Sequence, residues 1–79
     1  MLNDIMNNES SVILLQMDKS RLLDKEKDAI TDGIYALENK REYIKNKRSA
    51  ILTLSKLYLP EFNEDEKKAI TDAIYALCR

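Results

Sequence analysis

Two stretches of the chain, Asp24–Asn39 (DKEKDAITDGIYALEN) and Glu64–Arg79 (EDEKKAITDAIYALCR), are near copies of each other forty residues apart. Ten of their sixteen aligned positions are identical. Agreement of this kind predicts two helices built for equivalent environments. Two copies are fewer than the roughly three that a self-supporting repeat array needs, so a pseudo-twofold pair completed by other chains fits better.

Each copy is predicted to be a helix with two usable faces. The first copy carries a stripe of large apolar residues at the i, i+4, i+7 spacing of a buried helix face: Ile30, Ile34 and Leu37. Beside it runs a stripe of small residues: Ala29, Gly33 and Ala36. The second copy repeats both stripes, with Ala73 in place of Gly33. A simple three-helix core would account for this pattern. We expect instead that each repeat helix touches two neighbours, at least one of them from another chain.

The composition predicts a single all-α domain over residues 1–79. One Gly, one Pro, 34% charged and 44% apolar residues are typical of a helical chain. A chain of 79 residues buries only about 60% of its unfolded surface, which makes a partner chain an available source of further burial. The lone Cys and the absence of His exclude an internal disulfide and a conventional zinc site, so no cofactor or metal is expected.

Three helices are expected along the chain. The first spans residues 2–20, and a short strand over 11–15 is rejected because it has no partner strand. From Lys25 onward no stop signal is recognised before Pro60, and a seven-residue apolar spacing predicts one long helix of about 34 residues, or two nearly collinear helices. Asp24 is the expected N-cap of the long helix. Asn63 with Glu66 predicts a capping box before the C-terminal helix.

The apolar face of the first helix is Leu2, Ile5, Met6, Ile13 and Met17, and the seven-residue series is Ile30, Leu37, Ile44, Ile51 and Tyr58. The predicted architecture is a short N-terminal helix, a long central helix and a C-terminal helix forming a helical-bundle oligomer.

The middle of the chain, residues 39–59, is the basic region. It holds six cations and one acid, a local charge of +5, whereas the flanking stretches are acidic and the whole chain carries −1. The cations are Lys40, Arg41, Lys45, Lys47, Arg48 and Lys56, and Tyr43 lies among them. They could pair with acidic helices of the same or neighbouring subunits or simply be solvated. They could instead converge on an anionic small ligand through the bidentate fork of Arg, or bind an acidic protein or nucleic acid.

The repeat also retains matched polar residues. The retained residues are Thr31/Thr71 and Tyr35/Tyr75, and within a copy the Thr and the Tyr lie one turn apart on the flank of the core stripe. A structural role would have the Thr bond back to the preceding turn and the Tyr keep its hydroxyl in water. A functional role would have the two Thr/Tyr pairs line two equivalent pockets. Asp32 and Asp72 are retained in the same way.

The sequence argues against several other function classes. Without His, general base catalysis would fall to carboxylates, and the acid clusters are explained by their places at helix N-termini. A single glycine excludes a Gly-rich phosphate loop, and Cys78 has no base partner. The slightly negative net charge argues against nucleic acid. No stretch approaches the ~18 apolar residues of a membrane span, and no basic export signal begins the chain.

The expected function is binding without catalysis. The leading hypothesis is a cytoplasmic, homo-oligomeric interaction or inhibitor protein that occupies the surface of a protein partner. Its small size and its Asn-, Lys- and Ile-rich composition are typical of accessory proteins of phages and other mobile elements. The alternatives are an oligomer that sequesters an anionic, nucleotide-like ligand through Arg41, Lys45, Arg48 and the repeated Tyr and Thr residues, and a nucleic-acid accessory factor.

Overall fold

The chain is all-helical in its computed structural model, in which the backbone is described from Leu2 to Arg79 and the side chains from Glu9 onward. The α-helices are α1 (Leu2–Gln16), α2 (Asp24–Leu37), α3 (Lys47–Ser55) and α4 (Glu64–Cys78). Two short 3-10 helices, η1 (Arg41–Tyr43) and η2 (Leu59–Glu61), lie in the connections. Within these described residues there is no strand, which confirms the all-α prediction.

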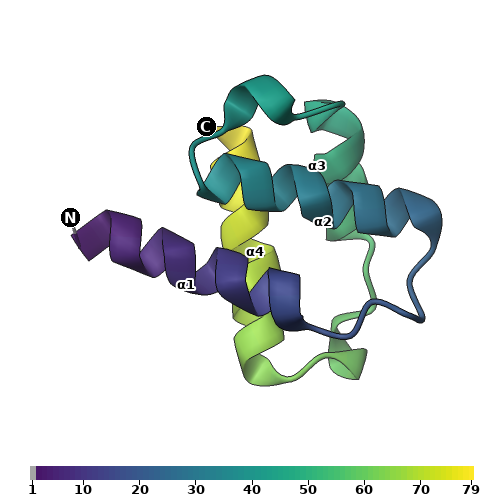
Figure 1. Ribbon diagram of the computed structural model, residues 1–79. Helices are drawn as coiled ribbons and strands as arrows, with labels where there is room; N and C mark the ends of the chain where they lie inside the picture. Colours follow the sequence, from purple (N-terminus) through teal and green to yellow (C-terminus); the bar gives the residue numbers. More distant parts are fainter. Residues whose placement is uncertain (1) are drawn as a thin grey trace.

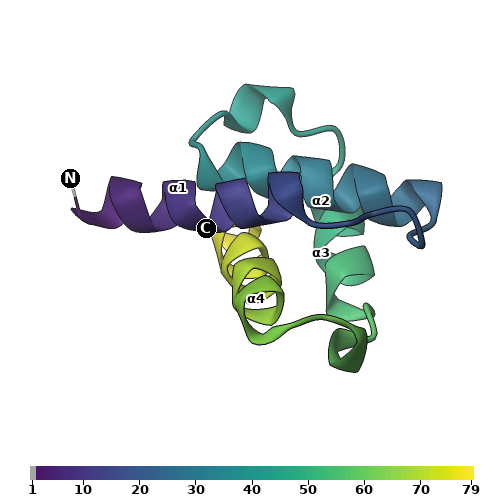
Figure 2. The same cartoon turned by 60° about the horizontal axis from the view of Figure 1, so that its bottom comes forward.

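The four α-helices form two hairpins that pack across each other (Figure 1). The helices of the first hairpin, α1 and α2, run in opposite directions, as do α3 and α4 in the second (Figure 2). The main contacts between the hairpins join α1 to α4, α3 to α2, and α2 to α4. The two helices that carry the repeat, α2 and α4, therefore meet inside a single chain.

The prediction of one long central helix is wrong, and so is the collinear alternative. Helix α2 ends at Leu37 because Asn39 takes a left-handed conformation (φ 63°) and the Lys40 amide donates to the Tyr35 carbonyl at 2.7 Å, which turns the chain. Helix α3 begins afresh at Lys47, where the Asn46 side chain accepts a hydrogen bond from the Ser49 amide at 3.0 Å. Helix α3 then packs alongside α2. The seven-residue spacing was therefore a coincidence of two separate helices.

The remaining predicted boundaries need smaller corrections. Asp24 is the first residue of α2, not its N-cap; the cap is Leu23, whose amide donates to the Glu26 carboxylate at 2.8 Å. Helix α1 ends at Gln16, short of residue 20, and Lys19 donates to the carbonyl of Leu14 at its end. The capping box of Asn63 and Glu66 is confirmed by both of its hydrogen bonds, at 2.8 and 3.1 Å. Of the predicted apolar face of α1, Met17 is buried and Ile13 half-buried, whereas Leu2, Ile5 and Met6 lie outside the described side chains.

The core is built from the two stripes of each repeat helix. Ile30, Leu37, Ile70 and Leu77 are all at most 4% exposed, and the small stripes are buried with them. The small residues let α2 and α4 approach closely where Gly33 faces Ala73. Burial of both stripes is thus achieved by helices of one chain, without the neighbouring chain that the sequence suggested.

The correspondence between the two halves continues beyond the predicted copies. Leu14 of α1 and Leu54 of α3, forty residues apart, are identical and fully buried. At the same offset, Met17 and Leu57 are both buried and Leu22 and Phe62 are both half-buried. Leu23 and Asn63 are both exposed. The two hairpins therefore have the same distribution of buried and exposed positions along most of their length.

Candidate functional site

The basic region is fastened to the end of α4. The guanidinium of Arg41 donates to the Ala76 carbonyl at 2.5 Å, and the ammonium of Lys47 donates to the Arg79 carbonyl at 3.4 Å. The last carbonyls of an α-helix have no partner within the helix and carry its negative dipole end. Two of the six cations, Arg41 and Lys47, therefore bond to backbone carbonyls at the end of α4, and not to the acidic side chains that the sequence suggested as partners.

Asp32 holds the same connection to α2. Its buried carboxylate accepts hydrogen bonds from the backbone amides of Lys45 and Asn46, at 3.1 and 3.2 Å. Sequence reasoning noticed Asp32 as retained in the repeat but assigned it no role. The sequence did place Asp32 beside the small stripe, one turn from both Ala29 and Ala36. A carboxylate on a buried helix face requires hydrogen-bond donors.

The connection between α2 and α3 presents one aromatic ring to solvent. Tyr43 is 58% exposed, and its ring packs against that of Tyr35 with centroids 5.5 Å apart. Lys45 and Arg48 are exposed, and their side chains have no hydrogen-bond or ion-pair partner among the described residues. Tyr43, Lys45 and Arg48 together are named the Tyr43 surface. Lys40, close by, forms an ion pair with Glu38 at 3.6 Å.

The matched Thr and Tyr residues lie in different settings. The hydroxyls of Thr31 and Thr71 donate to the carbonyls of Lys27 and Lys67, at 3.0 and 2.9 Å, as the structural interpretation predicts. Tyr75 is 65% exposed, whereas Tyr35 is half-buried beneath Tyr43. The structure thus packs Tyr35 against Tyr43. None of the repeated Thr and Tyr residues lines the three depressions described below, so two equivalent pockets lined by the Thr/Tyr pairs stay a prediction.

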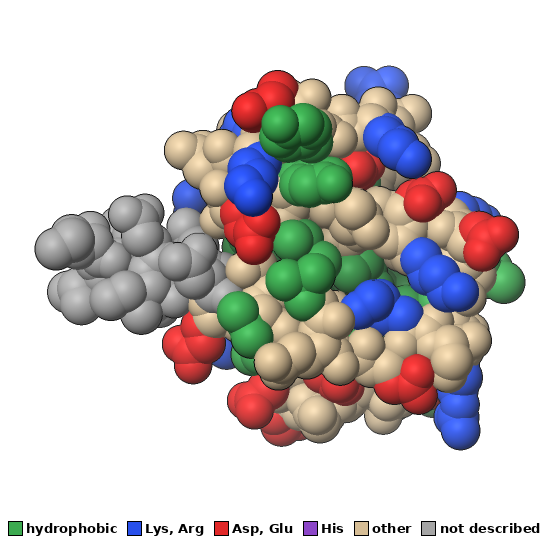
Figure 3. Space-filling view, viewed as in Figure 1, with side chains coloured by type: hydrophobic (Ala, Val, Ile, Leu, Met, Phe, Trp, Pro, Cys, Tyr) green, Lys and Arg blue, Asp and Glu red, His purple; other side chains and the backbone are tan. Residues whose placement is uncertain are grey.

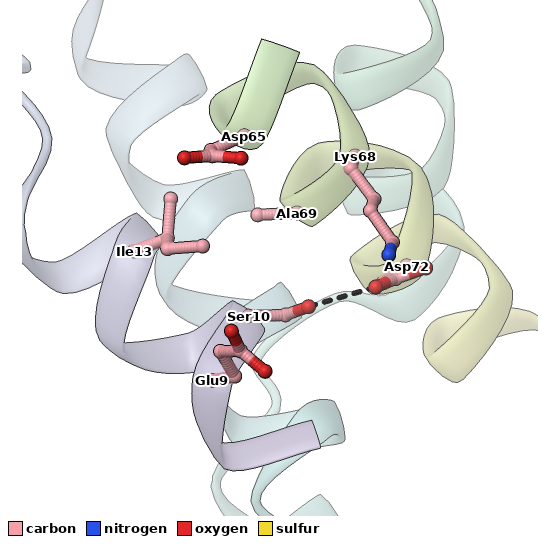
Figure 4. A pocket seen from close by; sticks show the side chains of 7 residues that line it. All are labelled: Glu9, Ser10, Ile13, Asp65, Lys68, Ala69 and Asp72. Atoms are coloured by element: carbon pink, nitrogen blue, oxygen red, sulfur yellow. Dashed lines mark hydrogen bonds between the residues drawn. The ribbon is translucent and has the colours of Figure 1, made fainter. Parts of the chain in front are cut away.

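Two matched depressions do exist, and other residues line them. One, of about 90 Å³, lies between α1 and α4, where the Ser10 hydroxyl donates to the Asp72 carboxylate at 2.7 Å (Figure 4). The other, of about 130 Å³, lies between α2 and α3 around Asp32. The linings correspond at the forty-residue offset: Ala69 with Ala29, Asp72 with Asp32, Ser10 with Ala50. Each repeat Asp therefore ties its helix to the neighbouring hairpin.

The first of these depressions is open and has carboxylates on both of its helices. Glu9 lies on α1, Asp65 and Asp72 lie on α4, and Lys68 points along α4 towards Asp72 (Figure 4). Over the described residues, no group of three or more His, Cys, Asp or Glu side chains is arranged to hold a metal ion. In the same part of the chain, no helix is both long and apolar enough to cross a bilayer.

The face seen in Figure 3 carries charges of both signs, interspersed with apolar side chains. It shows no continuous basic stripe of the kind that tracks a phosphate backbone.

No family model, no curated protein and no solved structure matches this chain. Support for a function therefore comes from the arrangement of the chain's own residues.

Proposed function

We propose that this protein is a small binding module that works by docking on another protein, in the manner of an inhibitor or accessory factor, and that it performs no catalysis. The observation that carries the proposal is the Tyr43 surface. An exposed Tyr is held against a second ring, and two exposed cations, Lys45 and Arg48, follow it closely in the sequence and have no side-chain partner among the described residues. Tyr and Arg are the residue types most enriched among the side chains that dominate binding energy at protein interfaces.

The anchoring of this segment supports the same proposal. Asp32 fixes the backbone at Lys45 and Asn46, and Arg41 fixes it to the end of α4. A segment that is already ordered loses less conformational entropy on binding than a free loop does, so more of its contact energy appears as affinity. Lys45 and Arg48 fit an acidic patch on the partner, because complementary charge speeds association and selects against wrong partners. A reducing intracellular compartment is part of the proposal, because the chain carries one free thiol.

Sequestration of an anionic nucleotide is the weaker alternative. It needs Arg41, Lys45 and Arg48 to converge on one ligand, yet Arg41 already donates to the Ala76 carbonyl. The described depressions have volumes of about 90, 130 and 150 Å³. These lie below the roughly 300–1,000 Å³ of typical small-molecule pockets. None of these three depressions therefore holds such a ligand by itself, and the alternative needs a site completed by several chains.

Affinity capture from a lysate of the natural host tests the proposal. We expect the wild-type protein to retain a defined protein that the double variant Tyr43→Ala/Arg48→Ala loses. The matched control is Tyr58→Ala/Lys56→Ala, which removes another exposed Tyr and another exposed cation from the same chain. Retention of the same proteins by all three samples would refute the proposed surface. Recovery of nucleic acid or a small anion by the wild type alone would instead favour one of the alternatives.

A further inference from the structure

A third depression lies where the turn between α1 and α2 meets the turn between α3 and α4. It has a volume of about 150 Å³ and is lined by Asp18, Arg21, Leu22, Glu61, Phe62 and Glu66. Leu22 and Phe62 occupy matched positions of the two hairpins and are both half-buried. Apolar side chains from both turns are therefore accessible in one concave place.

The rim of this depression is acidic. Three carboxylates stand against one guanidinium, that of Arg21, which leaves a formal charge of −2. The Ser20 amide donates to the Asp18 carboxylate at 2.9 Å and holds the pKa of that carboxyl below its ordinary value of 3.8. The Asp18 carboxylate is therefore ionised at neutral pH. An apolar floor beneath an acidic rim suits a Lys or Arg side chain, whose aliphatic stem and charged head need different surroundings.

The complementary chemistry is found at the other end of the molecule. In Figures 1 and 2, η1 and the connection that carries the Tyr43 surface lie at the end opposite to η2 and the start of α4. Residues 40–48 carry five cations and one acid, a local charge of +4. Residues 61–66 carry four acids and no base, a local charge of −4. The two segments are thus equal and opposite in charge and lie at opposite ends of one chain.

We propose that the acidic depression between the two turns binds the Tyr43 surface of a second copy of this chain, with Lys45 or Arg48 entering between Leu22 and Phe62. This inference rests on the proposed function in one respect, which is that the Tyr43 surface is a binding surface. Self-association covers that surface and so competes with the partner.

Complementary surfaces at opposite ends favour an assembly larger than a dimer, open or closed into a ring. Because the two complementary surfaces lie at opposite ends, each added copy leaves one of each kind free until a ring closes, and the contact is head-to-tail. The average mass should therefore rise with protein concentration and not stop at a dimer. Because the contact depends on exposed charges, added salt should weaken it strongly.

Analytical ultracentrifugation of the full chain tests this directly. At low ionic strength we expect the wild type to exceed 9.2 kDa increasingly from micromolar to submillimolar concentration, and to return to 9.2 kDa in high salt. Lys45→Ala/Arg48→Ala keeps only the acidic end, and Asp18→Asn/Glu61→Gln keeps only the basic end, so each should remain monomeric alone. Their equimolar mixture should form a 1:1 complex and nothing larger, because each has one functional end.

A matched control variant completes the test. Lys25→Ala/Lys27→Ala removes two exposed cations outside both surfaces and should associate like the wild type. A wild type that stays monomeric throughout, or a dimer unaffected by salt and by both double variants, would overturn the inference. A monomeric wild type that still captures its partner through Tyr43 would leave the proposed function standing and remove only the self-association.

Discussion

Gly33 of α2 and Ala73 of α4 occupy the same position of the two repeat copies and face each other where the helices cross. A Cβ atom placed on Gly33 would lie 2.8 Å from the Cβ of Ala73, closer than side-chain carbons approach in folded proteins. The Ala73 Cβ is bonded directly to the backbone of α4 and cannot swing away as the tip of a long side chain can. The one difference on the small stripe, Gly for Ala, is therefore what allows this crossing.

We predict that Gly33→Ala destabilises the protein despite its better helix propensity. The substitution gains about 1 kcal/mol from propensity in α2. It loses about 1–3 kcal/mol from overpacking at the crossing. A net loss of about 1 kcal/mol in the free energy of unfolding is expected from these two effects, measured by urea denaturation.

The double variant Gly33→Ala/Ala73→Gly separates crowding from propensity. It restores one Gly and one Ala at the crossing, so it should be more stable than Gly33→Ala alone. Ala73→Gly by itself should cost about 1 kcal/mol for the glycine in the middle of α4. A Gly33→Ala variant more stable than the wild type would show that the two helices can move apart without loss.

Asp32 gives a second prediction, about the connection that presents Tyr43. In Asp32→Ala, the amides of Lys45 and Asn46 lose the one acceptor that they have among the described residues. This should cost about 2–4 kcal/mol because charge-assisted hydrogen bonds are lost and donors are left unpaired. Hydrogen exchange of these two amides should accelerate more than exchange in the middle of α4. Chemical denaturation and exchange monitored by NMR measure the two effects.

Asp72→Ala is the matched control for Asp32→Ala. Asp72 is only half-buried and accepts one hydrogen bond, from the Ser10 hydroxyl, whereas Asp32 accepts two from backbone amides. We expect a loss of about 1 kcal/mol there. Equal losses at Asp32 and Asp72 would contradict the view that Asp32 specifically orders the segment before α3.

Local patterns predicted the elements whose partners lie within a few residues. The Asn63–Glu66 capping box and the buried faces of both repeat helices are of this kind, because the spacing of apolar residues and the cap chemistry are visible in the sequence. The pairing of α2 with α4 inside one chain was not visible. It depends on the break after Leu37, and an expected helix of about 34 residues could not have folded back on itself.

For the candidate site, the sequence predicted where the cations lie but not what they do. Arg41 and Arg48 belong to the same basic region, yet one donates to a carbonyl of α4 and the other has no described partner. That difference is set by the path of the chain between Asn39 and Asn46. Asp32, which fixes this path, lies thirteen residues before Lys45, so no local pattern links the two.

Substitution of Asn39 tests whether its left-handed backbone is what ends α2. Its left-handed backbone suits Gly or Asn, so Asn39→Gly should be neutral or slightly stabilising. Asn39→Val should lose about 1–3 kcal/mol, because a β-branched side chain is strained in that conformation. Circular dichroism and thermal unfolding of both variants measure helix content and stability. If Asn39→Val raised the helix content without loss of stability, the break would be optional and the long helix favoured by the seven-residue spacing would be accessible. We expect unchanged helix content, because the amides of Lys45 and Asn46 remain bound to Asp32 and Asn46 still caps α3.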